Sequence, residues 1–361
     1  MKPTKIVNPN RNSSLELLRI IAMFMIVFYH LILFFVEPID SNPVYKAIQI
    51  PIHIGVILFV LISGYFGIRP SFRGFFRILC VVSVYYLPLR LWYVYKTGMG
   101  GMAMLDSFHV LSKTPYWFVR TYLCLYLVSP LINKVLKDIS LRERLYYIFS
   151  FVVISVYLGM LQCDISLIDG KNLSNFVLIY IIGDTISKEK YRFAGISNTV
   201  FISAFLLLNI VLIGVYTTFS NRALIDFIWN WSFPYYSPFL LVSSILFFIP
   251  FTRFTIRSRV INLFAGSVLS IYIIHHQPYI LDVFLRPIAV SLYKMSDGDV
   301  LQCVVSNILF AIVIMIVCIM IDILFSPIFR VLDYVGKILS GFLLKVEIFF
   351  VNAFNKFLIL K

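Results

Sequence analysis

Runs of about twenty apolar residues recur along this chain, and they constrain its fold more than any other feature. Of its 361 residues, 60% are hydrophobic and only 13% are charged, which is about half the charged fraction of an ordinary soluble domain. A helix of about 20 apolar residues spans the hydrocarbon core of a bilayer. We therefore expect an all-α, polytopic integral membrane helix bundle of about ten transmembrane helices, over the ranges 15–36, 48–66, 75–95, 116–136, 145–161, 173–187, 198–218, 232–250, 260–284 and 301–325.

Lysine and arginine are distributed unevenly between the predicted loops. Of the 31 Lys and Arg residues, 21 lie in the termini and alternate loops on one side, seven lie in the loops on the other side, and Arg19, Arg90 and Arg120 fall inside spans. This bias follows the positive-inside rule and predicts that both termini are cytoplasmic. It also explains the net charge of +14 without a nucleic-acid partner, because topology and anionic membrane lipids account for the surplus.

The chain contains no separate soluble domain by composition, and we expect residues 1–325 to form one membrane unit. Residues 326–361 mix apolar residues with spaced lysines, which is typical of an amphipathic helix lying on the cytoplasmic face. The first apolar run lacks a small-residue cleavage site, so we expect it to be kept as the first span. The five cysteines are scattered, and their spacing suggests neither a disulfide framework nor a metal site.

Three ionisable residues lie within the first predicted span: Glu16, Arg19 and His30. Such residues are costly inside a bilayer and usually line a polar pathway or a reaction centre. Arg19 and His30 are eleven residues apart, which places them on the same helix face about 16 Å from each other along the axis. Glu16 precedes Arg19 by three residues, a spacing at which opposite charges pair. The sequence therefore predicts a polar helix face with an arginine near the cytoplasm and an imidazole deeper in the membrane.

Counting residues from the cytoplasmic end of each span predicts two polar layers. An outer layer, about 22–24 Å from the inner surface, contains His30, Arg90, Arg120 and His275, with Tyr116 and Trp117 just above it. A second layer at the inner face contains Arg19, Arg69, Arg73 and Arg77. Clustered guanidinium groups suit a ligand that carries phosphates, because each group can bind two oxygens at once.

Each of these groups also has a purely structural interpretation. The inner arginines can be topology charges near lipid headgroups, and the ion pair of the first span can be interfacial. Arg120 and Trp117 can anchor the outer end of a helix. His275 lies close to a proline, where a polar side chain can satisfy carbonyl groups that the break leaves free. His30 is the hardest to explain in this way, because an imidazole at that depth needs a buried partner.

At these residues the chain resembles the acyltransferase family 3 of integral membrane proteins. The first span, LELLRIIAMFMIVFYH, matches the family's pattern of an acidic residue, an arginine, ten further residues and a histidine. The second, GVILFVLISGYFGI, resembles its phenylalanine-rich run that ends in Ser-Gly and an aromatic residue. Three later segments resemble later spans of the family: PYWFVRTYLCLYLVSPLIN, IYIIGDTI and GSVLSIYIIHHQP. The last of them places His275 on the family's second histidine. The resemblance covers roughly residues 13–325.

The resemblance implies transfer of an acyl group, usually acetyl from cytoplasmic acetyl-CoA, to a hydroxyl of an extracytoplasmic carbohydrate at a bacterial cytoplasmic membrane. Arg19 and His30 carry over directly as functional positions. The family's third span often begins with two arginines three residues apart followed by a proline, whereas here Arg73 and Arg77 are four apart and Cys80 stands near the proline position. The acceptor glycan stays open, and so does the choice between His30 as general base and as covalent acyl carrier.

These considerations give each polar residue an expected role. We expect His30, Arg19, Glu16 and His275 in catalysis, Arg19, Arg69, Arg73 and Arg77 in binding the acetyl-CoA phosphates, and Trp117, Tyr116, Arg120 and Arg90 at the acceptor. The alternative is a transporter or flippase for a lipid-linked glycan, since intramembrane charges suit it equally well, and a third possibility is a regulatory or scaffold subunit for glycan assembly. The sequence lacks the repeated halves and paired broken helices common in such transporters, which favours the enzyme.

Overall fold

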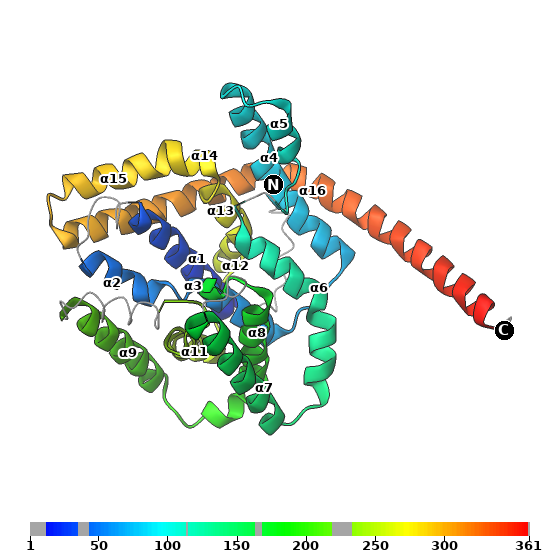
Figure 1. Ribbon diagram of the computed structural model, residues 1–361, viewed down its shortest axis with the longest axis horizontal. Coiled ribbons are helices and arrows are strands. Elements are labelled where there is room, and N and C mark those ends of the chain that lie inside the picture. The colour runs from blue at the N-terminus through cyan, green and yellow to red at the C-terminus, as the bar shows by residue number, and fades with distance from the viewer. Residues whose placement is uncertain (1–11, 35–42, 113–114, 163–167, 219–232, 360–361) are drawn as a thin grey trace.

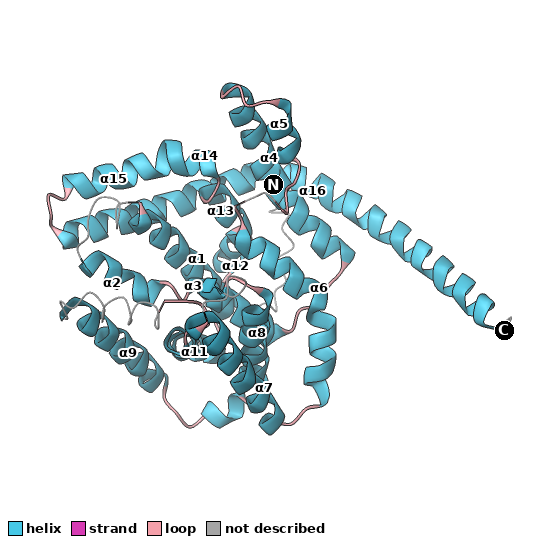
Figure 2. Cartoon of the chain, in the orientation of Figure 1, coloured by secondary structure: helices cyan, strands magenta, loops and turns pink. Residues whose placement is uncertain are grey.

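The computed structural model describes residues 12–34, 43–112, 115–162, 168–218 and 233–359. Across these ranges the chain forms helices joined by turns and loops, without any strand (Figure 2), which confirms the all-α prediction. The helices and short helical turns are α1 (Ser13–Leu33), α2 (Pro43–Ile52), α3 (Gly55–Phe66), α4 (Phe72–Lys96), α5 (Gly101–Ser107), α6 (Trp117–Asp138), α7 (Leu141–Ile154), η1 (Ser155–Leu161), η2 (Ile168–Gly170), α8 (Leu173–Lys188), η3 (Lys190–Phe193), α9 (Asn198–Thr218), α11 (Pro238–Arg253), α12 (Arg259–Ala265), α13 (Val268–His275), α14 (Pro278–Ile280), η4 (Leu281–Leu285), α15 (Arg286–Met295) and α16 (Val300–Ile359).

Helix α1 is the central helix of the bundle (Figure 1). It contacts α2, α3, α11, α12, α13, α15 and α16, and its Leu15, Leu18 and Ala22 are fully buried. The side chain of Asn12 caps its first turn by accepting a hydrogen bond from the Ser14 backbone N–H at 3.0 Å, which satisfies one of the donors left free at a helix start. The helix that carries the predicted polar face is therefore fixed by neighbours on several sides.

The backbones of helices α3 and α8 approach each other closely. A Cβ atom built on Gly64 would lie 2.2 Å from the Tyr180 carbonyl oxygen, and one built on Gly183 would lie 2.4 Å from the Leu61 carbonyl oxygen. Small residues at such a contact let two membrane helices pack tightly. This packing holds α3, which forms one wall of the site described below.

Two of the predicted spans are interrupted, although we expected no paired broken helices. The run predicted at 48–66 forms α2 and α3, which are separated by residues 53–54 and together make one span of 24 residues. The run predicted at 260–284 forms α12, α13 and α14, and the axis bends by 70° between Arg259–His275 and Pro278–Met295. Pro278 cannot donate a backbone hydrogen bond and starts a new helix rather than continuing α13. Both interruptions leave a histidine, His53 or His275, at or just beyond a helix end.

Five helices in the described residues are long and apolar enough to cross a membrane, or six if the bent pair is one span. Helices that are shorter or less apolar, among them α6, α8 and α11, occupy the other predicted ranges. Large apolar side chains are exposed along α9 and α16, as expected of surfaces that face lipid rather than water. The membrane bundle is therefore supported, whereas the count of about ten spans and the cytoplasmic termini stay predictions.

Helix α16 runs without interruption from Val300 to Ile359, and its C-terminal part extends away from the bundle (Figure 1). No helix end marks residue 326, where we expected the membrane unit to give way to an amphipathic segment. Before it leaves the bundle, α16 packs closely on α4, because a Cβ atom on Gly336 would lie 2.8 Å from the Phe76 ring. The position of residues 326–361 on the cytoplasmic membrane surface stays a prediction.

Candidate active site

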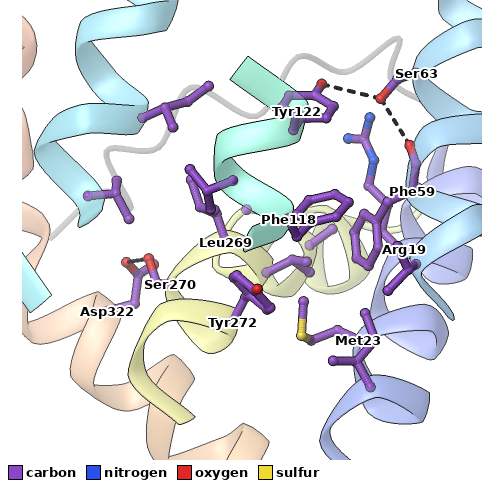
Figure 3. Close-up of a pocket in the computed structure, with 18 of the residues that line it drawn as sticks. Arg19, Met23, Phe59, Ser63, Phe118, Tyr122, Leu269, Ser270, Tyr272 and Asp322 are labelled. Carbon is purple, nitrogen blue, oxygen red and sulfur yellow. Dashed lines mark hydrogen bonds between the residues drawn. The ribbon is translucent and has the colours of Figure 1, made fainter. Parts of the chain in front are cut away.

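A cavity of about 710 Å³ lies beside α1, a volume typical of small-molecule sites. Its walls come from α1, α3, α4, α6, α12, α13 and α16. Figure 3 shows Arg19 of α1 near Phe59 and Ser63 of α3, with Phe118 of α6 across from them. The cavity is thus formed where helices distant in the sequence converge on the polar face of α1.

Four arginines from three helices line one end of the cavity, and we call them the arginine cluster: Arg19, Arg73, Arg77 and Arg330. Arg19 Nη1 lies 3.0 Å from Glu16 Oε1, so the ion pair expected from the sequence spacing is present. Arg73 forms a two-pronged ion pair with Asp333 of α16, in which its Nε donates to Oδ1 at 2.9 Å. The four guanidinium groups outnumber these carboxylate partners, which suits a ligand with several phosphate oxygens.

A buried carboxylate lies part-way along the cavity. Asp322 of α16 accepts hydrogen bonds from the hydroxyls of Ser270 at 2.6 Å and Ser267 at 2.6 Å, and from Tyr85 of α4 at 3.0 Å (Figure 3 shows the Ser270 bond). Three hydroxyl donors satisfy much of the hydrogen-bonding capacity of a carboxylate. The same contacts tie α4, α13 and α16 together at the cavity wall.

Further along α1, His30 contacts His275 of α13. The Nδ1 atom of His30 lies 3.0 Å from the Nε2 atom of His275. His275 is 1% exposed and lies behind the cavity, whereas His30 lines it. His276 adds a third imidazole, with its ring centroid 4.6 Å from that of His30. The sequence placed His30 and His275 in one layer, and the structure brings them into direct contact.

The hydrogen bonds of His275 determine which nitrogen of each ring carries a proton. His275 Nδ1 lies 2.7 Å from the Ile271 carbonyl oxygen, and a carbonyl only accepts, so Nδ1 is the protonated nitrogen. In the neutral imidazole that burial favours, His275 Nε2 is then an acceptor, and His30 Nδ1–H donates to it. The Nε2 atom of His30 is left with a free lone pair, which is the state a base or a nucleophile requires.

Aromatic side chains line the end of the cavity opposite the arginine cluster. Tyr29, His53, Trp117 and Tyr235 belong to this aromatic end. The His53 ring is stacked 3.9 Å from Phe233 and 4.5 Å from Tyr235, measured between centroids. Among the described residues that line the cavity, the charged ones belong to the arginine cluster or are Asp322 and Asp333. The two ends therefore offer different chemistry: cations at one and aromatic rings with polar edges at the other.

Comparison with known proteins identifies the family. Residues 12–326 match the model of acyltransferase family 3, which is described as an acyltransferase domain. The chain belongs to this acyltransferase family. No curated protein matches it, and no solved structure does. Family membership supports a membrane acyltransferase in general, and the geometry above shows which of its residues share one cavity.

The residues expected for this acyltransferase fall into three groups. Arg19, His30, Arg73, Arg77 and Trp117 line the cavity. Glu16 and His275 lie one contact behind it, bonded to Arg19 and His30 respectively.

The other four expected residues do not line the cavity. Arg69 is exposed, and Arg90 lies over the Tyr93 ring. Arg120 is exposed and donates to the Ser112 carbonyl oxygen. Tyr116 is fully buried and its hydroxyl donates to the Ile273 carbonyl oxygen at 3.1 Å. We predicted that Arg90 and Arg120 lie in one layer with the histidines, but neither arginine lines this cavity. Equal depth in a membrane does not make two side chains face each other.

Sequence reasoning missed several residues that line the cavity: Tyr29, His53, Tyr235, Asp322, Arg330 and Asp333. For His53 and Asp322 the signal was present, since both are ionisable residues within predicted spans and such residues are functional candidates by default. Arg330 and Asp333 were assigned to a segment outside the membrane unit. Tyr29 and Tyr235 carried no signal, because tyrosine is common throughout this chain.

Proposed function

We propose that this protein is an O-acetyltransferase of a bacterial cytoplasmic membrane that moves acetyl from cytoplasmic acetyl-CoA to a hydroxyl of a surface glycan. The observation that carries the proposal is a single cavity that has the arginine cluster at one end and is also lined by His30. His30 lies on α1, the helix that carries Arg19. Family membership supports acyl transfer. The positive-inside bias supports cytoplasmic placement of the arginine cluster and therefore of the donor.

The arginine cluster binds the phosphates of the donor. Acetyl-CoA carries a diphosphate and a further phosphate, and clustered guanidinium groups bind such oxygens through paired hydrogen bonds. Arg19 and His30 are eleven residues apart on α1, about 16 Å along the helix axis. An extended pantetheine arm is suited to crossing that distance along the cavity, past Ser63 and Ser270, and to delivering its thioester close to His30.

His30 then acts as the general base. Its Nε2 lone pair accepts the proton of the acceptor hydroxyl while the hydroxyl oxygen attacks the thioester carbonyl carbon. The new carbon–oxygen bond forms, the carbon–sulfur bond breaks, and the proton passes from His30 to the departing thiolate, so that the products are the O-acetyl ester and CoA. His275 keeps His30 in the required tautomer throughout, because its Nε2 accepts from His30 Nδ1–H.

The covalent product separates this proposal from transport of a lipid-linked glycan. Surface glycan from cells that lack the protein is compared by mass spectrometry with glycan from cells that carry the wild-type or the His30→Gln protein, at matched protein levels. Acetyl-transfer activity predicts a mass increment of acetyl groups only with the wild type. A glycan that changes its location but not its mass would instead identify a transporter, and an unchanged increment with His30→Gln would remove His30 from the mechanism.

A further inference from the structure

His53 is held in an unusual way at the aromatic end of the cavity. It lies where α2 has ended and α3 has not begun. Its ring is stacked on Phe233, with a centroid distance of 3.9 Å and an angle of 19° between the planes, and on Tyr235, at 4.5 Å and 15°. Two rings at these distances cannot share one face of an imidazole, so Phe233 and Tyr235 cover opposite faces.

This sandwich leaves only the edge of the His53 ring for other interactions. The edge carries both ring nitrogens, one a donor and one an acceptor in the neutral form. His53 lines the cavity, and no described residue makes a hydrogen bond to its ring. His275 differs in this respect, because both of its nitrogens have partners. A rigid, largely buried imidazole without a protein partner is costly unless a ligand or water completes its hydrogen bonds.

The surroundings of His53 indicate the chemistry of that ligand. The Tyr29 ring centroid lies 5.0 Å from that of His53 and 5.8 Å from that of His30, so this end of the cavity borders the proposed base. Trp117 lies 5.5 Å from Tyr235 and also lines the cavity. A sugar ring in the pyranose form has an apolar C–H face for aromatic side chains and hydroxyls around its rim for an imidazole edge. A cation does adjoin this end, since Lys171 Nζ lies 5.8 Å from the Trp117 ring centroid, but it is paired with Asp169 at 3.0 Å. A phosphate is better served by the four arginines at the other end, and a lipid chain would leave His53 unsatisfied.

We propose that Tyr29, His53, Trp117 and Tyr235 bind one pyranose residue of the acceptor. In this site His53 hydrogen-bonds one ring hydroxyl and so presents a neighbouring hydroxyl to His30 Nε2. His53 is a binding and positioning residue, and it takes no proton from the reacting hydroxyl. The inference rests on the proposed function, because it names the acceptor subsite of the same cavity.

Saturation-transfer NMR tests the site without catalysis. The purified full chain in lipid nanodiscs is mixed with the methyl glycosides of glucose, galactose and N-acetylglucosamine as probes. His53→Phe keeps a flat ring between Phe233 and Tyr235 but removes both nitrogens. His109→Phe is the matched control, because His109 is exposed on another loop and pairs with Asp106.

The expected result is saturation transfer to the sugar ring protons of at least one probe with the wild type and with His109→Phe, reduced at least fivefold in His53→Phe. His53→Asn, which restores a hydrogen-bonding edge, should recover part of the signal. Equal signals in the wild type and in His53→Phe would overturn the proposal, and so would the absence of transfer to any of the three probes. CoA binding to the same samples distinguishes the two claims: wild-type protein that binds sugar but not CoA would contradict the proposed function and leave the sugar site standing.

Discussion

The Nδ1 atom of His30 on α1 lies 3.0 Å from the Nε2 atom of His275 at the end of α13. The Ile271 carbonyl oxygen fixes the proton on the other nitrogen of His275, so one hydrogen-bonded chain runs from a backbone carbonyl through two imidazoles to a free lone pair at the cavity. The bend at Pro278 ends α13 at His275, the residue that links the backbone carbonyl to His30 in this hydrogen-bonded series.

His275→Leu should lower the turnover number for acetyl transfer about 100-fold, because His30 loses the acceptor that fixes its tautomer and orientation. The Michaelis constant for acetyl-CoA should stay within about twofold, since the arginine cluster is untouched. Steady-state kinetics with radiolabelled acetyl-CoA measure both quantities. His275→Gln, whose side-chain oxygen can accept from His30, should retain more activity than His275→Leu; equal loss in the two variants would argue against the tautomer role.

Arg330→Ala should weaken CoA binding at least about tenfold, because a charge-assisted hydrogen bond to a phosphate contributes about 1.5–3 kcal/mol. Isothermal titration of CoA into the purified protein in nanodiscs measures the dissociation constant. Arg69→Ala is the matched control, since Arg69 is exposed beside the same predicted membrane face and does not line the cavity. A larger loss with Arg69→Ala than with Arg330→Ala would show that general surface charge, rather than the arginine cluster, attracts the donor.

Asp333→Asn should tighten CoA binding about fivefold, a change of about 1 kcal/mol. In the structure Asp333 occupies the guanidinium fork of Arg73, so a phosphate has to compete with it for the same donors. The measurement is the same titration, compared at low and high salt. Weaker binding in Asp333→Asn would mean that Asp333 instead holds Arg73 in its productive position.

Gly64→Ala and Gly183→Ala should each lower the thermal unfolding midpoint by several degrees, because the added methyl group meets a backbone carbonyl oxygen of the opposite helix at the α3–α8 contact. Gly214→Ala on α9 should leave the midpoint unchanged or raise it, since nothing lies within 4 Å of its Cβ position and alanine favours a helix. Thermal denaturation followed by intrinsic fluorescence in detergent provides the comparison. Similar midpoints for all three variants would contradict the tight packing of α3 on α8.

The sequence was sufficient for the fold class and for part of the site, for identifiable physical reasons. Helix geometry alone places Arg19 and His30 on one face, and both line the cavity. Depth along a span says nothing about which way a helix is rotated, so Arg90 and Arg120 were assigned to a layer whose cavity they do not line. The stacking around His53 involves Phe233 and Tyr235, which are about 180 residues away and leave no local signal.

The continuity of helix α16 beyond residue 325 could not be predicted from the sequence either. Residues 326–361 carry lysines at intervals, which indicate a change of environment but not a change of secondary structure. Because the helix continues, Arg330 and Asp333 project from the same element as Asp322 and reach the cavity. The predicted site therefore lacked these two residues, which lie beyond residue 325.

In the proposed mechanism, one cavity connects a cytoplasmic donor with an acceptor on the other side of the membrane, and His30 lies between them. The most direct measurement uses proteoliposomes containing the purified chain, with radiolabelled acetyl-CoA on the side of the arginine cluster and de-O-acetylated surface glycan from the source cells on the other side. With the wild type, labelled glycan is expected on the far side, and with His30→Gln the label should fall about 100-fold or more. Equal labelling with His30→Gln, or no label in the glycan with correctly oriented wild-type protein, would rule this mechanism out.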